Sequence, residues 1–213
     1  MEESKSREKI LKKVRAALIQ GVVETQPDID LESEIYVIPP DPLEEIFAKK
    51  LLQLNGKFVF CESAAEFPAA FAAVVNENNW DRLFSKEEFI LKMLRDSGLP
   101  VSDKDEDFID MNVGLTSCEC LIARTGTVLV SSRQVSGRRL PVYPHYHIVV
   151  AFTDQLVMNI RDGLKMIKER YRDNFPSMIS AITGPSRTAD IEKTLVQGAH
   201  GPKEIYVFLI DRP

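Results

Sequence analysis

Residues 147–152, His147-Ile-Val-Val-Ala-Phe152, are an almost uninterrupted apolar run with two valines and an isoleucine. A short run of this kind is typical of a buried β-strand. A weaker strand pattern lies at Arg82-Leu-Phe84, and three further runs resemble the first: Phe58-Val-Phe-Cys61, Met178-Ile-Ser-Ala-Ile-Thr183 and Ile205-Tyr-Val-Phe-Leu-Ile210. Two more short apolar segments, at residues 120–123 and 128–130, predict a hairpin about Thr125-Gly126-Thr127.

Helical patterns lie between these runs. Asp41-Pro-Leu-Glu44 offers an N-cap, a proline at the first helical position and an acidic first turn. Ser63-Ala-Ala-Glu66 and Ser85-Lys-Glu-Glu88 match the capping-box pattern. Further helices are predicted at residues 155–170, with one apolar face, and at 187–197, ended by Gly198. That face is formed by Leu156, Ile160, Leu164 and Ile167. The alternation of strands and helices predicts an α/β fold.

The beginning of the chain has a different character. Residues 4–20 have apolar side chains at helical spacing, among them Ile10 and Val14, and predict an amphipathic helix that Gly21 ends. Residues 24–42 are acidic, contain prolines and lack periodicity, apart from a short extended piece at 35–38. We therefore expect an N-terminal helical arm, residues 1–34, followed by one α/β domain, residues 35–213.

Composition excludes several classes of protein. The chain has 213 residues, of which 44% are hydrophobic and 28% charged, as in soluble globular proteins. It has no apolar run long enough for a membrane-spanning helix, and its charged start does not resemble a secretory signal. Three cysteines are too few for a disulfide scaffold, so we expect a reducing cytoplasm. The net charge of −5 argues against nucleic-acid binding.

Charge is distributed unevenly along the chain. Residues 1–112 carry 14 lysines and arginines against 23 aspartates and glutamates, whereas residues 113–213 carry 13 against 9. The positive half is where an anionic small molecule is expected to bind. The alternative is that the acidic residues only solvate the N-terminal helices.

The most informative candidate site runs from Ile182 to Glu192. An apolar strand leads through Gly184 into a turn and the helix predicted at residues 187–197. Free backbone N–H groups at a helix start attract anions, the Ser186 and Thr188 hydroxyls add donors, and the Arg187 guanidinium binds carboxylate or phosphate. The alternative is that a hydroxyl merely caps the helix.

Small residues beside two strands form a second candidate. Gly114, Thr116, Thr125, Gly126 and Thr127 would allow a ligand to approach the backbone closely. Two tight turns explain them equally well. The segment is neither a Walker loop nor a Gly-x-Gly-x-x-Gly fingerprint.

Histidines and cysteines give weaker signals. His145 and His147 could share a metal, but no third ligand has a diagnostic spacing, so no metal site is predicted. His200, in a loop before the last strand, could bind a ligand or order the turn. Cys118-Glu-Cys120 has one intervening residue, which fits neither a redox pair nor an iron–sulfur motif, so no cofactor is predicted for this chain.

Five segments occur in an order that resembles the lactate utilization protein C family, whose characteristic unit is the lactate-utilization domain. They are Gly114-Leu-Thr116, Ile122-Ala-Arg-Thr-Gly-Thr127, His147-Ile-Val-Val150, Gly184-Pro-Ser-Arg-Thr-Ala-Asp-Ile-Glu192 and Gly198-Ala-His-Gly-Pro202. The resemblance covers residues 35–211. It implies a three-layer α/β/α domain like those of the sugar-phosphate isomerase and coenzyme A transferase superfamily. It also implies a bacterial system that oxidises L-lactate to pyruvate, in which partner proteins hold the iron–sulfur clusters. The resemblance supplies no catalytic residue.

Two departures from the family pattern bear on chemistry. Arg124 stands where the family usually has a glutamate, and Ser117-Cys118-Glu119 replaces a Gly-Ala-Asp. Arg124 favours anion binding over acid–base catalysis, while Glu119 could replace the missing acid in part. The leading hypothesis is an accessory, ligand-binding subunit. The alternatives are a stand-alone isomerase or acyl transferase and a purely structural subunit that docks through its arm.

Overall fold

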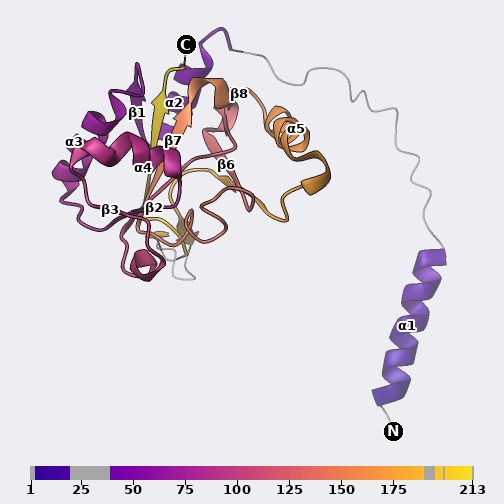
Figure 1. Ribbon diagram of the computed structural model, residues 1–213. Coiled ribbons are helices and arrows are strands. Elements are labelled where there is room, and N and C mark those ends of the chain that lie inside the picture. Colours follow the sequence, from indigo (N-terminus) through magenta and orange to yellow (C-terminus); the bar gives the residue numbers. More distant parts are fainter. Residues whose placement is uncertain (1–2, 20–38, 190–194, 199, 213) are drawn as a thin grey trace. The chain divides into compact units, whose positions relative to one another are not determined.

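The computed structural model describes residues 3–19, 39–189, 195–198 and 200–212. Contacts divide the chain into two units, residues 1–38 and 39–213, which are described separately. Of the first unit, the structure describes helix α1, Glu3–Ile19 (Figure 1). Its apolar side chains Ile10, Leu11 and Val14 are exposed. The predicted helix at the start of the chain is confirmed, whereas the extended piece at 35–38 lies outside the described residues.

A six-stranded parallel sheet forms the centre of the second unit. Its strands lie in the order β1-β12-β7-β4-β2-β3. Their bounds are β1 Lys57–Cys61, β2 Leu83–Ser85, β3 Val101–Ser102, β4 Val113–Thr116, β7 Tyr146–Phe152 and β12 Glu204–Ile210. The predicted strands at 58–61, 82–84, 147–152 and 205–210 are confirmed. However, β1 is an edge strand whose Phe60 is 47% exposed, so it is less buried than its apolar sequence suggests.

Two helices cover one face of this sheet. They are α3, Phe67–Asn78, and α4, Glu88–Leu94, which lie together on one side of the domain (Figure 1). The rings of Phe67 and Phe71 meet the ring of Phe208 edge-on, with centroids 5.4 and 5.8 Å apart. Edge-to-face aromatic pairs of this kind fix the position of a helix on a sheet beyond the effect of burial alone.

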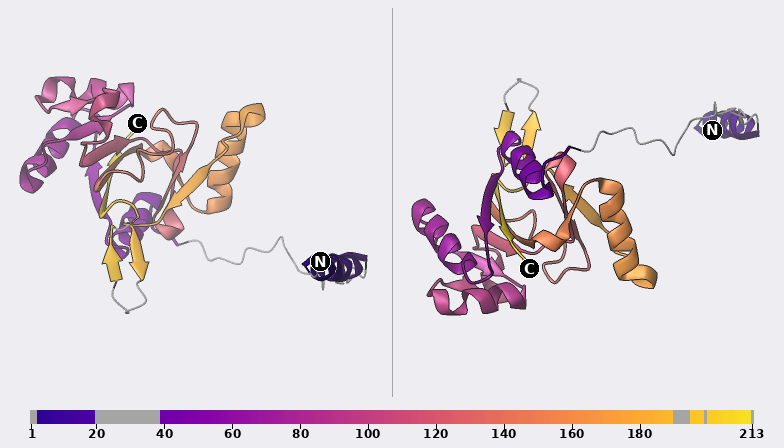
Figure 2. Two further views of the ribbon diagram at one scale, coloured as in Figure 1. Left: turned by 90° about the horizontal axis from the view of Figure 1, so that it is seen from below. Right: turned by 90° about the horizontal axis from the view of Figure 1, so that it is seen from above.

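A second sheet covers the opposite face. Its strands lie in the order β8-β5-β6-β9, with bounds β5 Cys120–Ile122, β6 Thr127–Ser131, β8 Leu156–Val157 and β9 Ile179–Ile182. Helix α2, Leu43–Gln53, packs beside it in the same core, and α5, Ile160–Tyr171, packs on its outer face through Ile167. Figure 2 shows α5 and the pair α3 and α4 on opposite sides of the two sheets. The predicted hairpin at 120–130 is confirmed, and so is the α/β class.

Five short 3₁₀ turns connect these elements. They are η1 Arg95–Ser97, η2 Asp105–Phe108, η3 Ala123–Thr125, η4 Thr153–Gln155 and η5 Arg172–Asn174.

The predicted helix at residues 187–197 is wrong. Strands β10, Arg187–Ala189, and β11, Leu195–Gln197, pair there antiparallel instead. Backbone bonds extend this ladder, because the Gly198 N–H donates to the Ser186 carbonyl at 3.0 Å and the Ser186 N–H donates to the Pro202 carbonyl at 2.9 Å. These non-local bonds outweigh the local helical pattern. Residues 187–189 therefore form a strand and not the start of a helix. The predicted anion site has no helix N-terminus at these residues.

Three predicted helix starts are displaced. Helix α2 begins after Pro42 rather than at it, α3 begins at Phe67 rather than beside Ser63, and α4 begins at Glu88. The Ser85 hydroxyl oxygen accepts the N–H of Glu87 at 3.2 Å, but it does so as the last residue of β2.

The helix expected at 155–170 begins only at Ile160. The Asp162 carboxylate accepts the backbone N–H of Asn159 at 3.1 Å and so fixes the start of α5 there. Leu156 belongs to β8, and both Ile160 and Leu164 are exposed, so the predicted apolar face is wrong except at Ile167.

Candidate functional site

The central sheet has a topological switch point between β2 and β4. These strands are neighbours, but the chain leaves β2 through α4 toward β3, at the sheet edge, and leaves β4 through the second sheet toward β7. In open parallel sheets, ligands bind outside the carboxyl ends of strands where the connections diverge in this way. The segments that follow Ser85 and Thr116 are therefore the expected location of a site.

Polar side chains gather at this point, in what we name the switch-point cluster: Glu87, Ser117, Gln134 and Ser136. Glu87 follows β2 and is 6% exposed, and its Oε1 accepts hydrogen bonds from the Ser117 hydroxyl, at 3.1 Å, and from the Ser136 hydroxyl. Ser117, which follows β4, accepts the Gln134 amide at 2.9 Å. No lysine or arginine among the described residues forms an ion pair with Glu87. A buried carboxylate with hydroxyl donors alone is suited to accept a further hydrogen bond.

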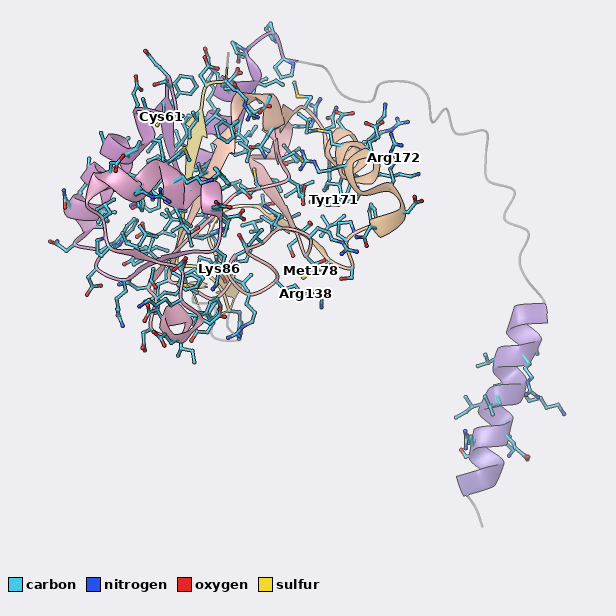
Figure 3. All side chains as sticks on the ribbon, viewed as in Figure 1. Cys61, Lys86, Arg138, Tyr171, Arg172 and Met178 are labelled. Atoms are coloured by element: carbon cyan, nitrogen blue, oxygen red, sulfur yellow. The ribbon has the colours of Figure 1, made fainter. Side chains whose placement is uncertain are left out.

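A second buried carboxylate, Glu119, has a different role. It is 1% exposed and bonds the Arg170 guanidinium at 2.6 Å, the Tyr171 hydroxyl at 2.7 Å and the Ser131 hydroxyl at 2.6 Å. These bonds tie the end of α5 to the second sheet, and Tyr171 is labelled in Figure 3. These partners of Glu119 thus give this carboxylate a structural role at the end of α5.

The cysteines beside Glu119 are inert. Burial raises the pKa of the Cys118 thiol far above its ordinary value, and burial together with Glu119 raises the pKa of Cys120 to about 12. Both side chains therefore remain neutral thiols, which are poor metal ligands and poor nucleophiles. Across the described residues, no group of three or more His, Cys, Asp or Glu side chains is placed to hold a metal ion.

A cleft of about 410 Å³ opens beside the switch-point cluster. Ser136 links the two, because it lines the cleft and donates to Glu87. Three cationic side chains also line the cleft, namely Lys86, Arg138 and Arg139. Figure 3 shows Lys86 and Arg138 on the same side of the domain. The cleft is thus positively charged and leads toward a buried carboxylate.

Each of these cations is held by its surroundings. Nζ of Lys86 lies 2.8 Å from Oδ1 of Asp105. The hydrogen bond from Lys86 holds the pKa of the exposed Asp105 carboxyl below its ordinary value. The Arg139 guanidinium lies over the Phe108 ring, 4.4 Å from its centroid, and Arg138 donates to the Ser177 hydroxyl. Neither arginine forms an ion pair with a carboxylate of the described residues, so both retain positive charge for a ligand.

Several predicted site residues come together elsewhere, at the end of helix α2. Hydroxyls of Thr125, Thr127 and Thr183 form a chain with distances of 2.7 and 2.9 Å. Gly126, with φ +62°, packs so closely that a Cβ would lie 2.7 Å from the Leu51 nitrogen, and Gly184, with φ +85°, packs on Leu54.

Arg187 lies beside these turns, at the carboxyl end of α2. Its guanidinium donates to the Leu54 carbonyl at the end of α2. A helix carboxyl end is its negative end, so this arrangement favours cations rather than anions. Leu54 also precedes β1, which places these turns at the amino end of that strand, away from the carboxyl ends.

Thr116 is separate from these turns. It is fully buried, donates to the Ser117 carbonyl at 2.9 Å and accepts from Nε2 of His147, also at 2.9 Å. Burial lowers the pKa of His147 to about 3, so its ring is neutral. The neighbouring Gly114 leaves room for packing rather than for a ligand, because a Cβ there would lie 2.8 Å from Pro144.

Three further predicted residues, Ser186, Thr188 and His200, lie in the segment that leads to the start of β12. Ser186 packs against Gly201, and His200 is exposed. Thr188 pairs with Val196 through the backbone of β10 and β11. Arg124 is half-buried and donates to the Asn159 side chain at 2.6 Å, at the start of α5. The predicted positions are therefore spread over three places.

Sequence reasoning missed Lys86, Glu87, Ser136, Arg138 and Arg139. A signal was present, since polar residues directly follow the strands at 82–84 and 113–116. However, Ser85 to Glu88 also fits a capping box, and only the strand order shows that the two strands are neighbours.

Comparison with known proteins identifies relatives of the chain. The profile of the LUD domain family matches residues 43–210. Two proteins named Lactate utilization protein C are similar. That of Deinococcus radiodurans is 35% identical over 121 residues, 56% of this chain and 55% of that protein, and that of Bacillus subtilis is 35% identical over 142 residues, 59% of each. The chain thus spans about half the length of the relatives that it matches.

A solved structure shows the same fold. The crystal structure of a DUF162 family protein from Deinococcus radiodurans superposes with a TM-score of 0.60 at 23% identity, over 81% of this chain and 99% of that one. In the described part of the chain, every helix is too short or too polar to cross a membrane.

Proposed function

The chain belongs to the LUD domain family, and on that premise we propose that it takes part in lactate utilization as an accessory, ligand-binding subunit. The names of its relatives support the process. The system would oxidise L-lactate to pyruvate in the cytoplasm, with electrons carried by iron–sulfur partner proteins.

One observation carries the ligand-binding role. The cationic cleft beside Glu87 lies at the switch point of a parallel sheet, where such folds bind ligands. Lys86, Arg138 and Arg139 suit a small anionic metabolite, because guanidinium and ammonium groups bind carboxylate and phosphate by charge-assisted hydrogen bonds. The Thr125–Thr127 and Gly184–Thr188 turns are the competing location for the anion.

Growth on L-lactate tests the proposed process. Deletion of the gene in its host should abolish growth on L-lactate and leave growth on pyruvate intact, and the wild-type gene should restore growth. Growth on L-lactate that is unchanged by the deletion would overturn the proposal.

Removal of residues 1–34 tests docking of the partners, because the shortened chain should fold but no longer co-purify with iron–sulfur proteins.

The second candidate function is a stand-alone isomerase or an acyl or coenzyme A transferase. Glu87 favours it, since a buried carboxylate with only hydroxyl donors suits acid–base or nucleophilic work. Turnover of sugar phosphates or acyl-coenzyme A by the purified chain alone, lost in Glu87→Gln, would establish this function in place of the accessory role.

A further inference from the structure

We propose that the cleft between Lys86 and Arg138 binds a nucleoside diphosphate group, free or as part of a larger cofactor, rather than lactate itself. The inference rests on the proposed ligand-binding function of the same cleft and names the class of ligand. Charge, size and the apolar wall of the cleft support it separately.

The cations of the cleft are spread over more positions than one carboxylate can contact. Three cations and one carboxylate, Asp105, line the cleft, and a second carboxylate, the buried Glu87, lies behind Ser136. The negative charge of lactate is confined to one carboxylate, whereas a diphosphate spreads its charge, about −1.5 to −2 on a terminal phosphate alone at pH 7, over two phosphate groups. A diphosphate therefore suits three separate cations better than a three-carbon acid does.

Lys86 is available to such a ligand. Its partner Asp105 has a side chain that is 95% exposed, and an ion pair with so exposed a carboxylate contributes little to stability. Lys86 also donates to the backbone carbonyl of Asp103, a bond that a ligand does not have to displace. A phosphate can therefore replace Asp105 at little cost. Arg138 and Arg139 are consecutive in the chain, and neither has to give up a carboxylate of the described residues to accept a phosphate.

The cleft is larger than lactate needs. A water molecule takes up about 30 Å³ of liquid, so a three-carbon acid with six heavy atoms needs at most about 180 Å³. The cleft of about 410 Å³ falls instead in the range of about 300–1,000 Å³ that is typical of sites for larger ligands.

Apolar side chains on the wall point to a ring in the ligand. Ile109 and Val135 line the cleft and are 69% and 70% exposed. Phe108, which stacks under Arg139, forms part of the same wall. Diphosphate alone would leave this apolar surface in water, whereas a nucleobase would cover it, and burial of apolar surface favours binding.

Titration calorimetry on the full chain tests the proposal with four probes: ADP, coenzyme A, inorganic pyrophosphate and L-lactate. ADP should bind, and pyrophosphate should bind at least several-fold more weakly because it lacks the ring. Coenzyme A, which contains the same group, should bind if the cofactor form is the ligand, and its failure to bind would assign the site to the free nucleotide. A hundredfold excess of L-lactate should not displace ADP.

Matched arginine variants locate the binding. Arg138→Ala and Arg139→Gln should each weaken ADP binding about tenfold to a hundredfold, as loss of a charge-assisted hydrogen bond predicts. Arg161→Ala removes an exposed arginine on α5 and should change binding less than twofold. The unfolding temperature of each variant shows that it is folded.

Three results would overturn the inference. Pyrophosphate that binds as tightly as ADP would remove the role of the ring, and unchanged ADP binding in both Arg138→Ala and Arg139→Gln would place the ligand elsewhere. Binding of L-lactate without binding of ADP would reject the nucleotide while the proposed function stands, whereas loss of growth on L-lactate tests that function independently.

Discussion

His147 makes the stability of the protein depend on pH in a defined window. Its ring is fully buried on β7, and burial holds the pKa of the imidazole at about 3 against an ordinary value of 6.5. The Thr116 hydroxyl donates to a carbonyl and therefore accepts the Nε2–H of His147, so the folded state keeps the neutral ring. Nδ1 finds no hydrogen-bond partner among the described residues.

The sign of the effect follows from proton binding. Below pH 6.5 the unfolded chain protonates His147, while the folded chain does so only near pH 3. The unfolded state then binds more protons, so the free energy of unfolding falls as the pH falls. Each pH unit within the window costs up to about 1.4 kcal/mol, so lowering the pH from 7 to 5 should remove about 2 kcal/mol through this residue alone.

Urea unfolding at pH 7 and pH 5 measures the effect, with His147→Gln as the test and the exposed His145→Gln as the control. The glutamine variant should be less stable than wild type at pH 7, and the gap should shrink by about 2 kcal/mol at pH 5 because glutamine does not titrate. His145→Gln should follow wild type at both pH values. A gap between wild type and His147→Gln that is the same at both pH values would refute the reasoning.

Two further predictions concern stability, each with a paired control. Arg170→Ala leaves the buried Glu119 carboxylate without its cation and should lower the free energy of unfolding in urea by about 3 kcal/mol or more. The control, Lys165→Ala, breaks an exposed pair with Glu169 on the same helix and should lower it by at most about 1 kcal/mol. Equal losses would show that Glu119 does not depend on Arg170. Gly126→Ala combines a left-handed backbone with a Cβ 2.7 Å from the Leu51 nitrogen, and Gly98→Ala has the same backbone with no neighbour within 4 Å. We expect Gly98→Ala to lower the free energy of unfolding by about 1–2 kcal/mol and Gly126→Ala to lower it by clearly more. Equal losses of stability in the two variants would contradict the close packing of Gly126 on α2.

The sequence predicts most strands because their signal is local. The run at residues 147–152 is apolar apart from His147, and it forms the strand β7, which lies between β12 and β4. The hairpin about Gly126 is equally visible, since two short apolar segments flank a Thr-Gly-Thr turn.

The failures arise where distant contacts decide. Residues 187–197 have a helical pattern, but backbone bonds from Ser186 to Gly198 and Pro202 favour a hairpin. The start of α5 depends on Asp162 accepting the N–H of Asn159, which outweighs the apolar Leu156 as a helix signal.

The candidate site is harder to predict than the fold. Glu87 and Ser117 are 30 residues apart, and only the strand order places β2 beside β4. Arg187 is another case, because a guanidinium beside a glycine turn predicts an anion site, and the sequence does not show that the Leu54 carbonyl is its partner in the fold. Residue type indicates what a side chain can bind, whereas topology decides what it meets.

A crystal structure of the chain with ADP tests the central claim most directly, because it shows where an anionic ligand binds. We predict density for the diphosphate between Lys86, Arg138 and Arg139, in the cleft beside Glu87. Density at the Thr125–Thr127 and Gly184 turns on the end of α2, with the cleft empty, would contradict the assignment of the ligand site to the switch point of the sheet.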